Sequence, residues 1–412
     1  MNIRKKAEDL AEKLIEWRRH LHSHPELSFE EYETAEFVAK KLRSLQGADI
    51  QTGVAKTGVV ATFSSGEGPV IALRADMDAL PITEEAGHAY ASKNAGVMHA
   101  CGHDAHTAIL LGAAHLLAEM FETGECRGTV KLIFQPAEET PDEEGLTGAY
   151  RMMEEGVYED VDVAAALHMC PWKPVGEVQV NDGYSMANVD VFNAEISGTG
   201  GHGAYPHLGT DPVWMLGPVL QALHGIVPRK VSPLDPAVIS VGSLHAGETS
   251  NVIPTAVTME GTMRSYSPEV RELLASELER AFSVVKQFGG HYKLNVMRGE
   301  PALDNNPAVN RLIADTIAGL FPSFKIEHAP FGLGGEDFGH VTKKIPGAMF
   351  FLGCALPDGK TRDLHTPFFD IDEACLPVGA AILTETAQRY VQHGQDIGSF
   401  EHFNSTGRSD DR

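Results

Sequence analysis

The sequence contains little cysteine, and what it contains is scattered. The five cysteines are Cys101, Cys126, Cys170, Cys354 and Cys375. An odd and widely spaced set does not form the disulfide framework of a small secreted domain. The first residues include Arg4, Lys5 and Lys6, but acidic residues follow them and an uninterrupted apolar stretch does not, so the segment lacks the pattern of a signal peptide. We therefore expect a cytoplasmic protein.

Positive charge and long hydrophobic runs are also scarce. The 33 Lys and Arg residues are outnumbered by 57 Asp and Glu residues, so the formal net charge at pH 7 is −24. A surface of this sign repels nucleic acid and anionic membranes, and we expect neither as a partner. No apolar run approaches the about 20 residues that span a bilayer. The composition is otherwise ordinary for a globular protein, and 412 residues predict two domains.

Helical and strand patterns alternate from the N-terminus to about residue 180. The predicted helices are Ile3–Leu21, Glu31–Leu45, Ala105–Met120 and Gly145–Glu155. The predicted strands are Gly58–Phe63, Val70–Ala75, Thr129–Gln135 and Val161–Leu167. This alternation predicts an α/β domain with a mixed sheet and helices on both of its faces.

The middle of the chain has a different order of elements. From residue 189 to residue 298 the pattern is strand, helix, strand, strand, helix, strand, which is the split βαβ arrangement of ferredoxin-like domains. The α/β pattern resumes at about Asn306, and the polar tail from about Ser399 is expected to be frayed. We therefore predict a catalytic α/β domain of residues 1–185 and 301–412. Residues 186–300 would form an inserted ferredoxin-like α+β domain.

A cysteine and a histidine stand close together in the segment Met98–His106. Cys101 and His103 flank Gly102, which permits a tight turn that directs both side chains to one point. A divalent cation stabilises a thiolate, and the start of a helix favours its negative charge. The pair is therefore a candidate for metal binding. Three further histidines stand nearby: His99, His106 and His115. Of these, His106 is expected to support the site rather than bind metal.

Two adjacent carboxylates follow the predicted strand Thr129–Gln135. Functional groups gather at the carboxyl ends of strands in α/β sheets. Glu138 and Glu139 suit a division of labour in which one carboxylate binds a metal ion and the other takes a proton from its bound water. Taken alone, the pair also fits the start of an acidic loop, since the acidic run 142–144 follows.

Other candidate groups occupy similar positions in the predicted α/β domain. His168 ends the predicted strand Val161–Leu167, and His365 precedes a turn and the last predicted helix. Asp76 and Asp78 follow another strand, where either carboxylate could orient a metal-binding imidazole. Because strand ends of this kind can meet at one edge of a sheet, their convergence predicts a metal centre there.

Eight motifs along the chain resemble those of a known family. They are Trp17–Leu27, Arg74–Pro81, His99–His106, Gln135–Glu139, Gly200–His207, Asn251–Pro254, Gly335–Phe338 and Leu364–Pro367. In all eight motifs the sequence resembles a family of metal-dependent amidohydrolases. This family includes hippurate hydrolase, N-acyl-L-amino-acid amidohydrolase and indole-acetyl-amino-acid hydrolase. These enzymes are relatives of aminoacylase and of carboxypeptidase G. The resemblance runs from Trp17 to the final helix.

The resemblance implies a site for two metal ions. The implied ligands are Cys101, which would bridge the two ions, and His103, Glu139, His168 and His365. Glu138 would be the general base and then the general acid, and Asp78 matches an aspartate of wider relatives that follows a histidine by two residues. Asp76 stands where wider relatives have a metal-binding histidine, and His103 supplies the displaced ligand. Asp76 is therefore not expected to bind metal.

The resemblance also assigns a role to the inserted domain. In the family this domain is a lid that often dimerises, so we expect a homodimer or a higher homo-oligomer formed through it. His202 would stabilise the oxyanion, in its own site or in the partner subunit's. Asn251 and Arg264 would lie near the carboxylate of the substrate.

The predicted activity is hydrolysis of the amide bond of small N-acyl amino acids, such as N-acetyl or N-benzoyl derivatives. The alternative for the same site is a dipeptidase or carboxypeptidase acting on small peptides. A second class is a cysteine hydrolase with Cys101 as nucleophile and His103 as base. A third class is a non-catalytic binding module. The presence of Glu138 argues against this class, because binding needs no general base. The mixed ligand set suits Zn²⁺ or Mn²⁺ and admits Co²⁺ or Ni²⁺.

Overall fold

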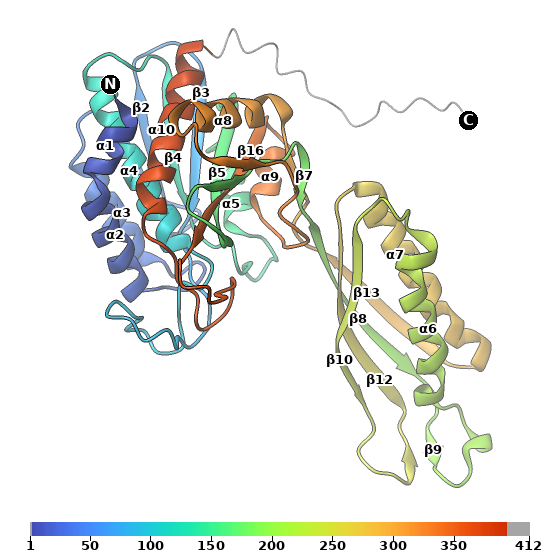
Figure 1. Ribbon diagram of the computed structural model, residues 1–412. Helices are drawn as coiled ribbons and strands as arrows, with labels where there is room; N and C mark the ends of the chain where they lie inside the picture. The colour runs from blue at the N-terminus through green and yellow to red at the C-terminus, as the bar shows by residue number, and fades with distance from the viewer. Residues whose placement is uncertain (1, 394–412) are drawn as a thin grey trace, which may run out of the picture. The chain divides into compact units, whose positions relative to one another are not determined.

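The computed structural model describes residues 2–393 and divides the chain into two compact units (Figure 1). The predicted frayed tail from Ser399 lies outside the described residues. The first unit contains residues up to Gly183, Asp304–Pro330 and the residues from His340 onward, and the second contains Tyr184–Leu303 and Phe331–Gly339. No helix in the described part of the chain is long and apolar enough to cross a bilayer.

The segment Phe331–Gly339 departs from the predicted division of the chain. It was expected in the catalytic domain, but it belongs to the second unit. The reason lies in its backbone, because Ala187 N–H donates to Gly334 O at 2.8 Å and Phe331 N–H donates to Ser185 O at 2.9 Å. These bonds join two parts of the chain that are about 150 residues apart in sequence, which no local pattern indicates.

An eight-stranded mixed sheet forms the centre of the first unit. Its strands stand in the order β1 (Ala48–Val54), β2 (Gly58–Ser64), β4 (Thr129–Gln135), β3 (Val70–Asp76), β5 (Val163–Pro174), β16 (Gly347–Ala355), β6 (Glu177–Gln179) and β15 (Lys325–Glu327). The four central strands β4, β3, β5 and β16 pair in parallel, so their carboxyl ends lie at the same edge of the sheet. The predicted mixed α/β sheet is confirmed.

The helices outside the inserted elements are α1 (Ile3–Asp9), α2 (Ala11–Ser23), α3 (Tyr32–Arg43), α4 (His103–Glu122), α5 (Gly148–Glu154), α8 (Pro307–Leu320), α9 (Phe338–Thr342) and α10 (Cys375–His393). Helices α3, α4, α5, α8 and α10 contact strands of this sheet, whereas α1 and α2 pack on α4 and α10. Helix α4 contacts β3 and lies beside α10 and α2 (Figure 1). Nearly all of its side chains are buried, which is what a helix without a polar face requires. The single helix predicted over Ile3–Leu21 is wrong, because the chain breaks at Leu10 into α1 and α2.

Strand β5 is longer than predicted. It was expected to end at Leu167, which would have placed His168 at a strand end. Instead the parallel pairing with β16 continues from Leu167 opposite Phe350 to Cys170 opposite Gly353. Both sides of β5 are buried from Val163 to Cys170, so the strand gives no polar signal of an end at Leu167. His168 therefore projects from within a strand.

The second unit contains a four-stranded antiparallel sheet in the order β10 (Ala237–Ala246), β12 (Ala256–Ser265), β8 (Asn188–Ser197) and β13 (His291–Arg298). Helices α6 (Pro212–Lys230) and α7 (Pro268–Ser283) complete the chain order β8, α6, β10, β12, α7, β13. Alternate residues of β8, such as Phe192, Ala194 and Ile196, are buried in one apolar cluster with side chains of both helices. The shorter elements are β7 (Gly183–Met186), β9 (Gly201–His202), β11 (Val252–Ile253), β14 (Leu303–Asn305), η1 (Pro206–Leu208) and η2 (Val284–Phe288).

Candidate metal centre

The turn between Cys101 and His103 is set by glycine. Gly102 has φ +94°, a left-handed conformation in which a side chain is strained. A Cβ at this position would also lie 2.8 Å from Met169 Cγ. The turn starts helix α4 at His103 and leaves the Cys101 sulfur 3.5 Å from Nε2 of His168. The predicted convergence of these three side chains is therefore present.

His103 is held in one orientation by Asp78. Its Nδ1–H donates to the carbonyl oxygen of Asp78 at 3.0 Å and to Oδ1 of the same residue at 3.1 Å. The other oxygen of Asp78 accepts Glu139 N–H at 2.9 Å and the Ser28 hydroxyl at 2.7 Å. With Nδ1 bonded to Asp78, the ring directs Nε2 towards the cluster, in the orientation of a metal ligand held by a carboxylate.

Asp76 is occupied by other partners. Its Oδ1 accepts His106 Nδ1–H at 2.6 Å, and its Oδ2 accepts from Arg74 at 2.6 Å. His106 in turn accepts Met169 N–H on Nε2 at 2.9 Å. Both ring nitrogens of His106 are therefore engaged. Asp76 Oδ2 also lies 3.6 Å from His103 Nε2, and Asp76, His103 and His106 form a further group of potential ligands.

Glu139 joins the remaining candidates. Its Oε1 lies 3.4 Å from His365 Nε2 and 3.8 Å from His103 Nε2, while Glu138 Oε2 lies 4.0 Å from the same His103 atom. His365 reaches this place because its N–H donates to Ala100 O at 2.8 Å, with the His365 backbone in the left-handed region at φ 60°.

The candidate ligand atoms form overlapping groups. Cys101, His103 and His168 form one group and Cys101, Glu139 and His365 form another, each with its donor atoms within 4.8 Å of one another. The sulfur belongs to both groups. The five predicted ligands are thus gathered at one place, although they come from segments up to about 260 residues apart.

Electrostatics and unpaired atoms test whether these residues fit a cation. His103 Nε2 and Glu139 Oε1 are buried and make no hydrogen bond. Burial opposes charge on His103, but Asp76, Asp78 and Glu139 outweigh it and raise its pKa to about 10. A bound cation would neutralise this excess of negative charge, and it would give a partner to His103 Nε2 and Glu139 Oε1. The residues fit a metal site.

The thiol of Cys101 distinguishes the metal centre from a cysteine hydrolase. Burial, followed by the charges of Glu139, Glu138 and Asp76, raises the pKa of Cys101 well above its usual value. A nucleophilic cysteine needs the opposite shift, which a neighbouring positive group provides. Burial and the nearby His106 lower the pKa of His168, so its imidazole is neutral and suited to binding metal.

His202 lies on the short strand β9 of the second unit, and Asn251 directly precedes the neighbouring strand β11. His202 pairs with Val252 across β9 and β11, and Gly203 N–H donates to Asn251 O at 2.9 Å. Ala204 N–H donates to His202 Nδ1 at 3.0 Å, so a neutral His202 carries its proton on Nε2. His202 and Asn251 are both exposed.

Arg264 stands on β12 of the same unit. Its guanidinium donates to Thr262 Oγ1 at 3.3 Å and to Leu333 O at 3.4 Å. Burial alone lowers its pKa, which means that no carboxylate of the described chain acts on it. A half-buried guanidinium without an ion pair among the described residues has capacity for an external anion.

Sequence reasoning missed several residues that position the centre. Glu31 accepts Ala137 N–H at 2.8 Å and the Thr57 hydroxyl at 2.5 Å, and so holds the turn before Glu138, where Ala137 has φ 49°. Ser28 was also missed. Both lie just after the motif Trp17–Leu27, and their proximity to that motif is the only local signal that could have found them.

Most of the chain matches the sequence model of a known protein family. The profile of Peptidase family M20/M25/M40 matches residues 72–389. The chain belongs to this family. The predicted family and the predicted class of enzyme, a metal-dependent amidohydrolase, are therefore confirmed.

Named relatives cover nearly the whole chain. An N-acetyl-L-cysteine deacetylase of Bacillus subtilis (strain 168) is 42% identical over 392 residues, which are 94% of this chain and 90% of the relative. IAA-amino acid hydrolase ILR1-like 2 of Arabidopsis thaliana is 35% identical, over 97% of this chain and 90% of the relative. The crystal structure of the Bacillus subtilis YXEP protein, described as a dinuclear metal binding peptidase from the M20 family, has a TM-score of 0.81. It is 35% identical and covers 93% of this chain and 99% of its own.

Proposed function

We propose that the protein hydrolyses the amide bond of small N-acyl amino acids at a centre for two divalent metal ions. The observation that carries the proposal is the pair of ligand groups that share Cys101. A sulfur common to both groups suits a bridge between two ions. Similarity to a deacetylase and to an amino acid conjugate hydrolase supports the substrate class.

Five side chains would hold the ions. These ligands are Cys101, His103, Glu139, His168 and His365. When bound, two divalent ions would polarise the scissile carbonyl and lower the pKa of a water molecule towards neutrality. The ligand chemistry suits Zn²⁺ or Mn²⁺ and admits Co²⁺ or Ni²⁺.

Glu138 would move the proton in this reaction. It stands directly beside the ligand Glu139, and its Oε2 lies 4.0 Å from His103 Nε2. The carboxylate would accept the proton of the attacking water and deliver it to the leaving amine. Asp78 would keep His103 in the tautomer that binds metal, in keeping with the hydrogen bonds from Nδ1 to Asp78.

The second unit would supply groups that recognise the substrate. His202 would donate from Nε2 to the developing oxyanion, and the hydrogen bond from Ala204 N–H to Nδ1 supports this tautomer. Arg264 would bind the substrate carboxylate, supported by its lack of an ion pair among the described residues. Asn251 would assist it.

The role of the second unit as a lid is part of this proposal. The strand order β10-β12-β8-β13 with two helices supports a ferredoxin-like domain. We infer that it mediates a homodimer or a higher homo-oligomer, and that the protein acts in the cytoplasm on a small molecule.

A substrate panel tests the proposal. The metal-free protein would be assayed with N-acetyl, N-benzoyl and N-succinyl amino acids and with dipeptides, after addition of each candidate metal. We expect turnover of at least one N-acyl amino acid only when metal is present. Faster cleavage of dipeptides than of every N-acyl amino acid would favour the peptidase alternative, and turnover that survives chelation would reject the metal centre.

A further inference from the structure

A second cluster of potential ligands lies outside the proposed catalytic residues. It consists of His22 on α2 and of Glu84 and His88 in the segment between β3 and α4, and their donor atoms lie within 4.8 Å of one another. Glu84 Oε1 is 3.4 Å from His22 Nε2 and 3.1 Å from His88 Nε2. In a tetrahedral zinc site with bonds of about 2.0–2.1 Å, neighbouring ligand atoms are about 3.3–3.4 Å apart. The two spacings are close to this value.

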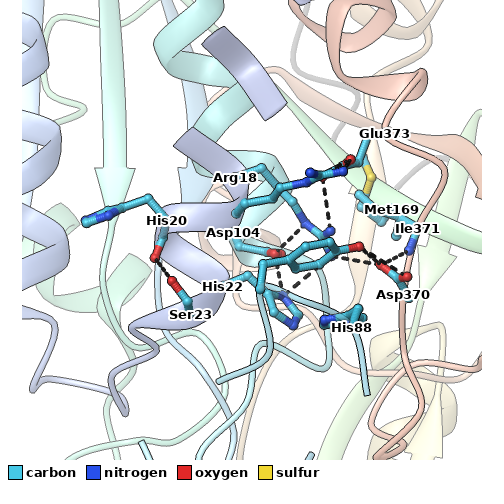
Figure 2. A network of polar contacts seen from close by, with 12 residues as sticks. Arg18, His20, His22, Ser23, His88, Asp104, Met169, Asp370, Ile371 and Glu373 are labelled. Atoms are coloured by element: carbon cyan, nitrogen blue, oxygen red, sulfur yellow. Dashed lines mark hydrogen bonds and ion pairs between the residues drawn. The ribbon is translucent and has the colours of Figure 1, made fainter. Parts of the chain in front are cut away.

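His22 is oriented in the way that metal-binding histidines are. Its Nδ1–H donates to Asp104 Oδ2 at 2.8 Å, and the same oxygen accepts from Arg18 Nε at 2.8 Å (Figure 2). The ring is completely buried and its Nε2 faces Glu84. A carboxylate behind Nδ1 fixes the ring and increases the basicity of Nε2.

Glu84 presents one oxygen to the two imidazoles. Its Oε2 accepts Ser92 N–H at 2.6 Å, which leaves Oε1 towards His22 and His88. Burial alone would raise the pKa of Glu84, but hydrogen bonds from His22 and Ser92 lower it below its usual value. The side chain is therefore a carboxylate at neutral pH.

His88 has no hydrogen bond to account for its position. Both of its ring nitrogens are buried and unpaired, although Nε2 lies near Glu84, and the ring stacks on Tyr90 with centroids 3.9 Å apart. Burial lowers its pKa, so the ring is neutral and has a lone pair to donate. A buried imidazole with neither nitrogen satisfied is costly, and an ion on one nitrogen would remove that cost.

His99 provides an independent sign of a missing partner. Its side chain is 1% exposed, and both of its ring nitrogens lack a hydrogen bond. Its ring centroid is 6.4 Å from that of His22, so a second buried imidazole without a hydrogen bond lies beside the cluster.

We propose that His22, Glu84 and His88 bind a divalent ion of the zinc type at a site separate from the catalytic centre. Two imidazoles and a carboxylate leave a fourth position for water. The segment Pro81–Val97 contains no helix or strand, and an irregular segment of this length is uncommon in a compact domain. The ion would fasten it to α2, and Glu85 N–H also donates to Pro367 O, close to His365.

Zinc stoichiometry tests the site. Wild type, His88→Ala and the control His291→Ala, an exposed histidine of the second unit, would be loaded with Zn²⁺, desalted and measured by mass spectrometry of the metal. We expect His88→Ala to hold one zinc ion fewer per chain than the other two proteins. His88→Cys, which replaces one zinc ligand by another, should restore that ion even if His88→Ala folds poorly.

Proteolysis at Lys93 provides a second readout. This exposed residue lies in the irregular segment, so after Zn²⁺ has been added to both proteins trypsin should cut there several-fold faster in His88→Ala than in wild type. Equal zinc content in wild type and His88→Ala would overturn the proposal and leave a protonated His22 that bridges Asp104 and Glu84. The test compares the zinc content of wild type with that of His88→Ala, and ions at the catalytic centre contribute equally to both. The result therefore does not depend on whether the protein cleaves N-acyl amino acids.

Discussion

Two candidate residues of the first unit and one of the second are held in different ways. In the first unit, Asp78 and His103 are almost completely buried, and Asp78 alone accepts bonds from three separate segments of the chain. In the second unit, His202 is exposed and its side chain is held by one local bond, from Ala204. Buried groups that are held from several segments suit an ion that must be bound before the reaction. Exposed groups suit a partner that comes and goes. Metal content should therefore depend on the first unit, while the second should affect substrate binding and turnover and leave metal content unchanged.

The largest effect is expected at the pair Glu138 and Glu139. Glu138→Gln should lower kcat by about 10²–10⁴-fold because it removes the proton acceptor, and metal content should stay unchanged. Glu139→Gln is the matched variant, and it should lose bound metal as well as activity. Kinetics and metal analysis of both proteins check this. Loss of metal in Glu138→Gln, with normal metal in Glu139→Gln, would exchange the two roles.

A smaller effect is expected in the second unit. His202→Ala should lower kcat by about 10²–10³-fold, since an oxyanion donor acts in the transition state, and metal content should equal that of wild type. Steady-state kinetics would separate kcat from KM. His245→Ala, which removes another exposed histidine of the same unit, is the control. A change confined to KM would show that His202 does not stabilise the oxyanion. Loss of metal in this variant would show that the second unit also contributes to metal binding.

The smallest effect concerns the buried carboxyl of Glu31. Burial and the charge of Asp78 raise its pKa to about 7, against hydrogen bonds from Thr57 and Ala137 that lower it. The folded protein therefore binds this proton more tightly than the unfolded chain, whose carboxyl titrates near 4.5. Stability from Glu31 is present below pH 4.5 and is lost as the pH rises from 4.5 through 7.

The variant Glu31→Gln should not show this loss. Its free energy of unfolding relative to wild type should increase between pH 5 and pH 8 by up to about 3 kcal/mol. Denaturant unfolding in the presence of a chelator measures the difference, and the exposed neighbour in Glu30→Gln gives the control. A constant difference across this pH range would show that Glu31 carries the same charge in both states.

The sequence determined most of the elements and the identity of the reacting groups. The apolar pattern predicted β4 to the residue, and the cysteine-glycine-histidine turn at Gly102 is a local feature with a local cause. Apolar runs give no sign of where a doubly buried strand stops, which is why the end of β5 was misplaced. The tail and the roles of the second unit stay predictions.

Only the tertiary structure decided which distant groups meet. The bond from His365 N–H to Ala100 O, the support of the Glu138 turn by Glu31, and the meeting of His22 with Glu84 join segments from about 60 to 260 residues apart. Local patterns fix the period and face of an element, because these follow from backbone geometry alone. Contacts between distant segments depend on strand order and on irregular segments, and for these the sequence carries no periodic signal.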